Sequence, residues 1–169
     1  MDHEREVKSK HAVHFSSARA DWATPWPFFN KLNEEFGFTL DVCAEPHNAK
    51  CEEYFTPEDD GLKQEWFGRC YCNPPYGRDI GKWVTKARLW SSWNRAWVVM
   101  LLPARTDTRW FHSDIVGYAE EVRFVKGRIK FEGSSAGAPF PSMVVVFTDR
   151  DLIDDEPVVQ TRFTTMPSK

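Results

Sequence analysis

The longest apolar run in the chain, AWVVMLLP from Ala96 to Pro103, constrains the possible fold most. It has the length of a strand, and its residues are apolar without alternation. This pattern is typical of a strand that is covered on both faces at the centre of a parallel sheet. The run is much shorter than the roughly 20 apolar residues of a membrane helix, so no membrane association is expected.

Helical and strand patterns alternate on both sides of this run. Thr24 is a predicted N-cap and Pro25 a first-turn residue of a helix that ends before Gly37. Residues 121–133 alternate around Gly127, which predicts a hairpin. The other predicted helices span residues 79–92 and 107–119, and the predicted strands span 38–44, 53–56, 68–72, 95–103 and 142–148. The order predicts an α/β domain with a mostly parallel sheet, helices on both faces and an antiparallel edge hairpin.

The length of 169 residues suits a single domain. Residues 1–14 are expected to form a flexible charged arm, residues 15–148 the domain, and residues 149–169 a polar tail. The first ten residues, MDHEREVKSK, contain no apolar signal segment, so the protein is expected in the cytoplasm.

The cysteines do not predict a metal site. Their spacing fits no zinc template, and a cytoplasmic chain keeps its thiols reduced. We therefore expect no metal and no disulfide among Cys43, Cys51, Cys70 and Cys72.

Positive charge is concentrated in the middle of the chain. Residues 78–130 contain 11 Lys and Arg against 5 Asp and Glu, although the whole chain has a net charge of −3. This region is either a surface that faces phosphates or a set of solvated helix faces.

The stretch Asn73-Pro74-Pro75-Tyr76 follows the predicted strand GRCYC, at the carboxyl end where ligands of open α/β sheets bind. The two prolines hold the turn extended, which fixes the direction of the Asn73 amide and of the Pro74 carbonyl. These groups offer two acceptor oxygens to the N–H groups of an amine on a planar base. Tyr76 offers a face on which the base can stack.

This arrangement favours methylation of the amine. The lone pair of an aromatic amine is delocalised into the ring, and two acceptors that bind its hydrogens in a pyramidal arrangement localise that pair for attack on an electrophilic methyl group. Positioning and electrostatics carry the step, without a strong base beforehand. In duplex DNA the nucleotide has to flip out of the stack to enter such a site.

Two other segments lie where a cofactor would bind. Asp41 ends a predicted strand, and its carboxylate could meet a cationic amino-acid group or a ribose hydroxyl, or cap a loop. Residues Tyr54, Phe55 and Thr56 end the next strand, where an adenosine would lie, although the two aromatic residues could equally belong to the core.

Taken together, these segments resemble the DNA N-6-adenine methyltransferase family found in phages and prophages. The similarity covers most of the chain, from about Asp21 to Phe147, in unbroken order. The matching blocks are DWATPWPFFNKLNEEFGFTLDVCAEPHNAKC, YFTPEDDGLKQEW, NPPYGR, LLPARTDTRWFH, RFVKGRIKF and APFPSMVVVF.

The resemblance implies a minimal Rossmann-like methyltransferase domain that uses S-adenosylmethionine to methylate adenine N6 in DNA. It implies that Asn73, Pro74, Pro75 and Tyr76 form the catalytic motif. It also implies that Thr24 and Pro25, and the segment Asp41 to Ala44 with Cys43, help to hold the cofactor. Methyltransferases in general place a glycine-rich turn after the first strand. Here Ala44-Glu45-Pro46-His47 takes that place, and no glycine follows until Gly61.

No separate recognition domain is visible, so DNA contacts are expected from exposed cations, with weak sequence selectivity. The candidates are the residue after the motif, the helix over 79–92, the residue after the central strand, and the predicted hairpin. They are Arg78, Lys82, Lys86, Arg88, Arg105, Arg123, Lys126, Arg128 and Lys130.

Alternative functions share the same local chemistry. N4-cytosine, RNA and protein-glutamine methyltransferases also clamp an sp² nitrogen between acceptors, and a catalytically inactive nucleic-acid-binding relative would retain the basic surface. Intact Asn73 and Tyr76 argue against the inactive relative. We expect a monomer or weak dimer.

Overall fold

A computed structural model describes residues 22–148 and 160–169. Its sheet has seven strands in the order β2-β1-β3-β4-β6-β5-β7. In chain order the strands are β1 (Leu40–Asp41), β2 (Glu53–Tyr54), β3 (Arg69–Cys72), β4 (Trp97–Pro103), β5 (Glu121–Lys126), β6 (Ser142–Phe147) and β7 (Arg162–Pro167). The helices are α2 (Trp26–Phe36), α3 (Ile80–Trp93) and a short π-helix η1 (Phe111–Ile115).

The sheet is mostly parallel, which confirms the predicted fold class. Strands β2, β1, β3 and β4 run in parallel, and β6 is antiparallel to both β4 and β5. Strand β7 is parallel to β5 and closes the far edge. The first two strands are shorter than the sequence predicts, with two residues each.

Strand β4 is the buried centre that its sequence predicts. Residues Val98 to Pro103 are all buried. Because successive side chains of a strand point to opposite faces, the strand contributes to two cores. Met100 and Leu102 pack into the cluster on the α3 side, whereas Val99 and Leu101 pack into the cluster on the α2 side.

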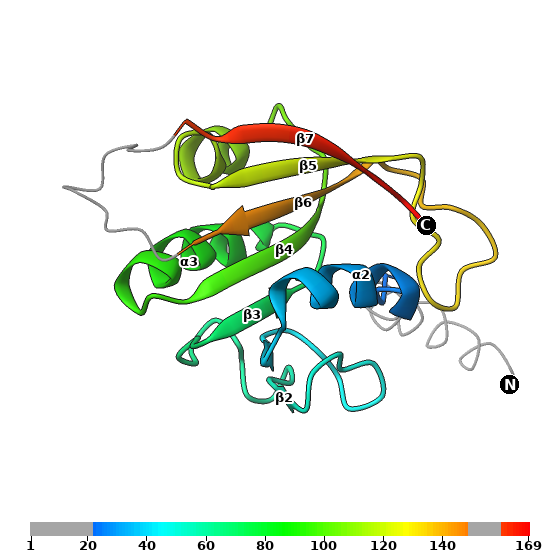
Figure 1. The fold of residues 1–169 in the computed structure, drawn as a ribbon. Helices are drawn as coiled ribbons and strands as arrows, with labels where there is room; N and C mark the ends of the chain where they lie inside the picture. The colour runs from blue at the N-terminus through cyan, green and yellow to red at the C-terminus, as the bar shows by residue number, and fades with distance from the viewer. Residues whose placement is uncertain (1–21, 149–159) are drawn as a thin grey trace, which may run out of the picture.

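Helices α2 and α3 cover opposite faces of the sheet (Figure 1). Helix α2 ends where predicted, at Gly37 in the left-handed conformation with φ of 63°. The predicted N-cap role of Thr24 is wrong: the N-cap is Pro25, and the Thr24 hydroxyl binds elsewhere. The predicted helix over 107–119 is reduced to the turn around η1, whose Asp114 binds Arg88 of α3 at 2.9 Å.

The predicted hairpin over residues 121–133 is not formed. Gly127 does follow β5 in a turn, with φ of +88°, but β5 pairs with β6 and β7. Ile129 and Phe131 instead lie in a loop, where both are buried in the α2-side cluster. Exposed and buried residues alternate in this loop as they would in a strand.

The predicted polar tail is also only partly a tail, because its end forms β7. Phe163 of β7 stacks on Phe124 of β5, with 6.1 Å between ring centroids and 8° between planes. Residues 149–159 of the tail and the predicted arm over 1–14 lie outside the described residues.

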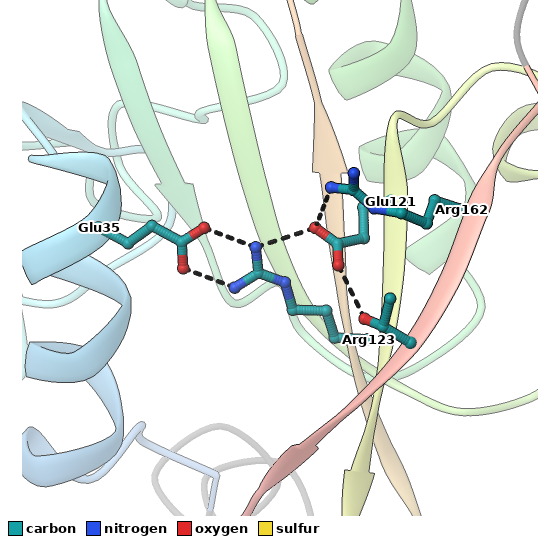
Figure 2. Close-up of polar contacts among 5 residues, drawn as sticks. Glu35, Glu121, Arg123 and Arg162 are labelled. Atoms are coloured by element: carbon teal, nitrogen blue, oxygen red, sulfur yellow. Dashed lines mark hydrogen bonds and ion pairs between the residues drawn. The ribbon is translucent and has the colours of Figure 1, made fainter.

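An ion-pair network attaches β7 and β5 to α2. Figure 2 shows Arg123 between Glu35 of α2 and Glu121, with Arg162 on the other side of Glu121. Glu121 also accepts a hydrogen bond from the Thr164 hydroxyl at 2.7 Å. Burial by itself would raise the pKa of Glu121, but hydrogen bonds from Arg123, Thr164 and Arg162 outweigh it and lower this pKa to about 2.

We expect this network to make the fold sensitive to acid. The folded pKa of Glu121 lies below its ordinary value of 4.5, so its contribution to stability is present above pH 4.5 and is lost as the pH falls toward 2. Melting temperatures measured across this range should fall less steeply for Glu121→Gln than for the unmodified protein. The control is Glu53→Gln, at an exposed position on β2. Parallel curves for Glu121→Gln and the unmodified protein would contradict the assigned role.

Four parallel strands bring their carboxyl ends to one edge of the sheet. Strand β1 ends at Asp41, β3 ends next to Asn73, β4 ends next to Arg105, and β5 ends at Lys126. Asp41, the turn that starts at Asn73, Arg105 and Lys126 therefore share this edge.

Candidate active site

An open cavity lies at this edge of the sheet. It joins the Asn73–Tyr76 turn to segments far away in the sequence, namely residues 22–24 before α2 and the loop that follows β1. Most of the predicted catalytic and cofactor residues line it: Thr24, Asp41, Cys43, Ala44, Asn73, Pro74, Pro75 and Tyr76.

The Asn73 side chain is held by its nitrogen and not by its oxygen. Its Nδ2 group donates to the Trp22 carbonyl oxygen at 2.7 Å and to the Thr24 hydroxyl at 3.1 Å. Its Oδ1 atom is buried and accepts no hydrogen bond from any residue in the described part of the chain. A buried acceptor without a partner costs about 1–3 kcal/mol; because Asn73 lines the cavity, this oxygen is a candidate acceptor for a ligand with an N–H or O–H group.

Tyr76 lines the cavity, and its hydroxyl is bound to strand β4. The hydroxyl donates to the Leu101 carbonyl of β4 at 3.1 Å, and the ring meets Phe140 edge to face at 5.5 Å between centroids. Burial raises the pKa of Tyr76 far above its ordinary value, so the phenol stays protonated at neutral pH. Its arrangement suits stacking and not proton abstraction.

Asp41 closes the loop that takes the place of a glycine-rich turn. Its two carboxylate oxygens accept the backbone N–H groups of Cys43 at 3.3 Å and Lys50 at 3.0 Å. Burial raises the pKa of Asp41 to about 7, against the lowering effect of these two bonds. The predicted loop-capping role is therefore real, and the residue also lines the cavity.

Lys50 and Trp22, which were not predicted as site residues, also line the cavity. The Lys50 side chain is only 2% exposed; its ammonium group binds Glu132 at 3.1 Å and lies 4.2 Å from the centre of the Trp26 ring. No local sequence pattern marks either residue, because their partners are distant in the chain.

A second hollow of about 300 Å³ adjoins the first and shares Cys43 and Pro57 with it. The predicted cofactor residues Phe55 and Thr56 line it, together with Asp60, Gly61 and Trp83, which the sequence analysis did not single out. A Cβ atom at Gly61 would lie 2.2 Å from the Val42 carbonyl oxygen, so this close approach requires glycine. Pro25 and Tyr54, also predicted to hold the cofactor, line neither hollow.

The predicted DNA-contacting cations fall into two groups. Exposed cations without an ion pair to any residue in 22–148 or 160–169 lie on segments that follow β3, β4 and β5: Arg78, Arg105, Lys126, Arg128 and Lys130. Lys82 is exposed but pairs with Asp79 at 2.8 Å.

The other predicted cations are bound to groups within the folded chain. The Arg123 side chain is 16% exposed and binds two carboxylates (Figure 2). On α3, Lys86 donates to the carbonyl oxygens of Leu62 and Gln64, and Arg88 pairs with Asp114. We therefore leave Arg123, Lys86 and Arg88 out of the basic surface.

The described residues contain neither a membrane-spanning helix nor a cluster of metal-ligating side chains. No helix within 22–148 or 160–169 has the length and apolar character that crossing a membrane requires. In the same residues, no three His, Cys, Asp or Glu side chains are grouped so that they could hold a metal ion.

The chain is similar to one family of known proteins and to individual phage proteins. The profile of the family described as DNA N-6-adenine-methyltransferase (Dam) matches residues 12–159. The DNA N-6-adenine-methyltransferase of Haemophilus phage HP1 (strain HP1c1) is 36% identical over 134 residues, which cover 75% of this chain and 77% of the phage protein. The protein of the same description from Escherichia phage T1 is 37% identical over 95 residues, covering 53% of this chain and 38% of that protein.

Proposed function

Because the chain belongs to the DNA N-6-adenine-methyltransferase (Dam) family, and is an enzyme of that class, we propose that it uses S-adenosylmethionine to methylate an adenine that is flipped out of DNA into the cavity beside Asn73. The observation that carries this proposal is the Asn73 Oδ1 atom, a buried acceptor that lacks a partner among the described residues. The amino group of adenine carries two N–H donors and would satisfy it.

The residues of the cavity would act by position. Asn73 Oδ1, with the Pro74 carbonyl, would accept the two amine hydrogens and localise the nitrogen lone pair. Tyr76 would stack against the purine, with its ring held by the bond to Leu101. When bound, S-adenosylmethionine would supply the electrophilic methyl group; its transfer to the amine nitrogen would leave S-adenosylhomocysteine, and one amine proton would pass to water. Groups that are in place before the reaction lower the barrier without reorganising.

The two adjoining hollows fit the donor. The larger one is lined by Asp41, whose carboxyl group suits the ammonium group or a ribose hydroxyl of the donor; the Lys50 ammonium is already paired with Glu132. The smaller one has Phe55 and Trp83 in its walls, which suit a flat base, and Asp60 offers an acceptor. An elongated ligand could cross from one to the other past Cys43 and Pro57.

The exposed cations at the same edge would hold the DNA backbone. We expect that the triple variant Lys126→Gln, Arg128→Gln and Lys130→Gln weakens DNA binding and makes the slope of log K against log salt shallower by about 2 to 3, since each neutralised phosphate contributes about 0.9. Binding titrations at several salt concentrations measure this slope. Unchanged affinity for S-adenosylmethionine would show that the variant is folded, and an unchanged slope would exclude this loop from the DNA surface.

The direct test is methyl transfer from labelled S-adenosylmethionine, with DNA, RNA and protein as separate acceptors. The expected product is N6-methyladenine in DNA, identified by nucleoside analysis. N4-methylcytosine, or label in RNA or in glutamine side chains, would replace the proposed substrate by one of the alternatives with the same chemistry. Retained DNA binding without binding of S-adenosylmethionine would indicate an inactive relative.

A further inference from the structure

An asparagine side chain can turn either its oxygen or its nitrogen toward a ligand, and the hydrogen-bond partners of the amide determine which atom it is. For Asn73 the decisive partner is the Trp22 carbonyl, 2.7 Å away, which can only accept. The nitrogen must therefore face Trp22. The second partner of this nitrogen, the Thr24 hydroxyl, supports the same orientation from 3.1 Å.

The Thr24 hydroxyl is itself fixed by a second buried hydroxyl. Thr24 Oγ1 and Tyr71 Oη lie 2.7 Å apart, and the two residues are 2% and 1% exposed. Tyr71 cannot turn away easily, because its ring packs edge to face on Phe29 of α2 at 5.0 Å between centroids. Burial keeps the pKa of Tyr71 well above its ordinary value, so its proton remains available to the pair.

We infer that Thr24 and Tyr71 are positioning residues that, with the Trp22 carbonyl, hold the Asn73 amide so that its oxygen is presented to the substrate amine. This inference rests on the proposed function of Asn73. It gives Thr24 a role different from a helix cap and from a cofactor contact, since its hydroxyl is already engaged by Tyr71 and Asn73.

The contacts of the Asn73 amide with Trp22 and Thr24 also favour asparagine over aspartate at position 73. In the variant Asn73→Asp, the new carboxylate would offer acceptor oxygens to the substrate, but it would also place an oxygen 2.7 Å from the Trp22 carbonyl, with no hydrogen between them. Two buried acceptors in contact repel, so the carboxylate has to turn out of the productive orientation. Asn73→Asp should therefore slow methyl transfer even though it retains acceptor oxygens.

The test compares Thr24→Val, which removes the hydroxyl, with Thr24→Ser, which keeps it. Single-turnover rates at saturating S-adenosylmethionine and DNA are measured together with the dissociation constant for S-adenosylmethionine and the melting temperature. Thr24→Val should lower the rate about 10- to 100-fold at nearly unchanged affinity, and Thr24→Ser should stay close to the unmodified rate. Tyr71→Phe should fall between them, and Asn73→Asp should lose at least as much as Thr24→Val.

A second readout is independent of turnover. The Asn73 side-chain N–H groups should exchange slowly with solvent in the unmodified protein and in Thr24→Ser, and faster in Thr24→Val, by nitrogen-15 NMR. Unchanged rate and exchange in Thr24→Val, with Asn73→Ala inactive, would overturn the positioning role and leave the proposed function intact. Weaker binding of S-adenosylmethionine with a normal rate at saturation would make Thr24 a cofactor contact instead. If Asn73→Ala itself is fully active, the proposed function fails.

Discussion

Asn73→Ala is expected to lower the single-turnover rate of methyl transfer by about a thousandfold, in line with the loss of one preorganised polar group at a reacting centre. The variant removes the oxygen that would hold the substrate amine, while Asp41, Lys50 and the second hollow remain. The dissociation constant for S-adenosylmethionine, measured by calorimetry, should therefore change little.

The matched control is Asn30→Ala, an exposed substitution on α2 outside the cavity, which should leave the rate unchanged. The two variants together separate loss of the amide from a general effect of an asparagine substitution. A near-normal rate for Asn73→Ala would reject the Asn73–Tyr76 turn as the reaction centre.

Tyr76→Ala should have the second largest effect, because it removes the face on which the flipped base stacks. Stacking of a base on an aromatic side chain is worth about 1–3 kcal/mol, so weaker binding of an extruded adenine and a loss of roughly 5- to 150-fold in kcat/KM are expected. Binding of S-adenosylmethionine should again serve as the measure of an intact cavity.

Tyr76→Phe is the informative partner of that variant. It keeps the ring and removes only the bond to the Leu101 carbonyl, a contact worth about 1 kcal/mol, so the loss in kcat/KM should be about tenfold or less. Steady-state kinetics on the same DNA compare the two. Equal losses would show that the hydroxyl, and not the ring, is what the reaction requires.

The central strand β4 could be predicted because a continuous apolar run of its length has few other structural explanations. A continuous apolar run with the length of β4 is buried on both faces, and the two helices that precede it, α2 and α3, each show an apolar face. The turn at Asn73 could be placed at a strand end for the same reason, since it directly follows β3.

The errors arise where distant partners decide the structure. Ile129 and Phe131 alternate with polar residues as a strand would, yet they are buried in a loop. The sequence of β7 predicts a tail because Arg162 and Thr164 are polar. Their partner in the structure is Glu121, about 40 residues away in the sequence, so no local pattern indicates a strand here. Arg123 is predicted as a DNA contact because Glu35, one of its two carboxylate partners, lies 88 residues away in the sequence; Glu121, the other, is two residues away on the same face of the strand.

Within the cavity, the chemical role of a single residue could be predicted better than its hydrogen-bond partners. Asp41 is recognisable as a strand-end carboxylate, and its two backbone N–H partners account for the absence of a glycine-rich turn. The Asn73 amide is recognisable as an acceptor, but the contacts with Trp22 and Thr24 that hold its nitrogen span 51 and 49 residues.

The reversal of β6 has a geometric consequence for substrate capture. Two successive changes of direction, from β4 to β6 and from β6 to β5, cancel, so the chain leaves β5 on the same rim as it leaves β3. With only one change, Lys126 and the cations after it would emerge on the opposite rim, a full strand length from Asn73. Under the proposed function, the two reversals therefore place the cations that would hold DNA on the same side of the domain as the Asn73 turn.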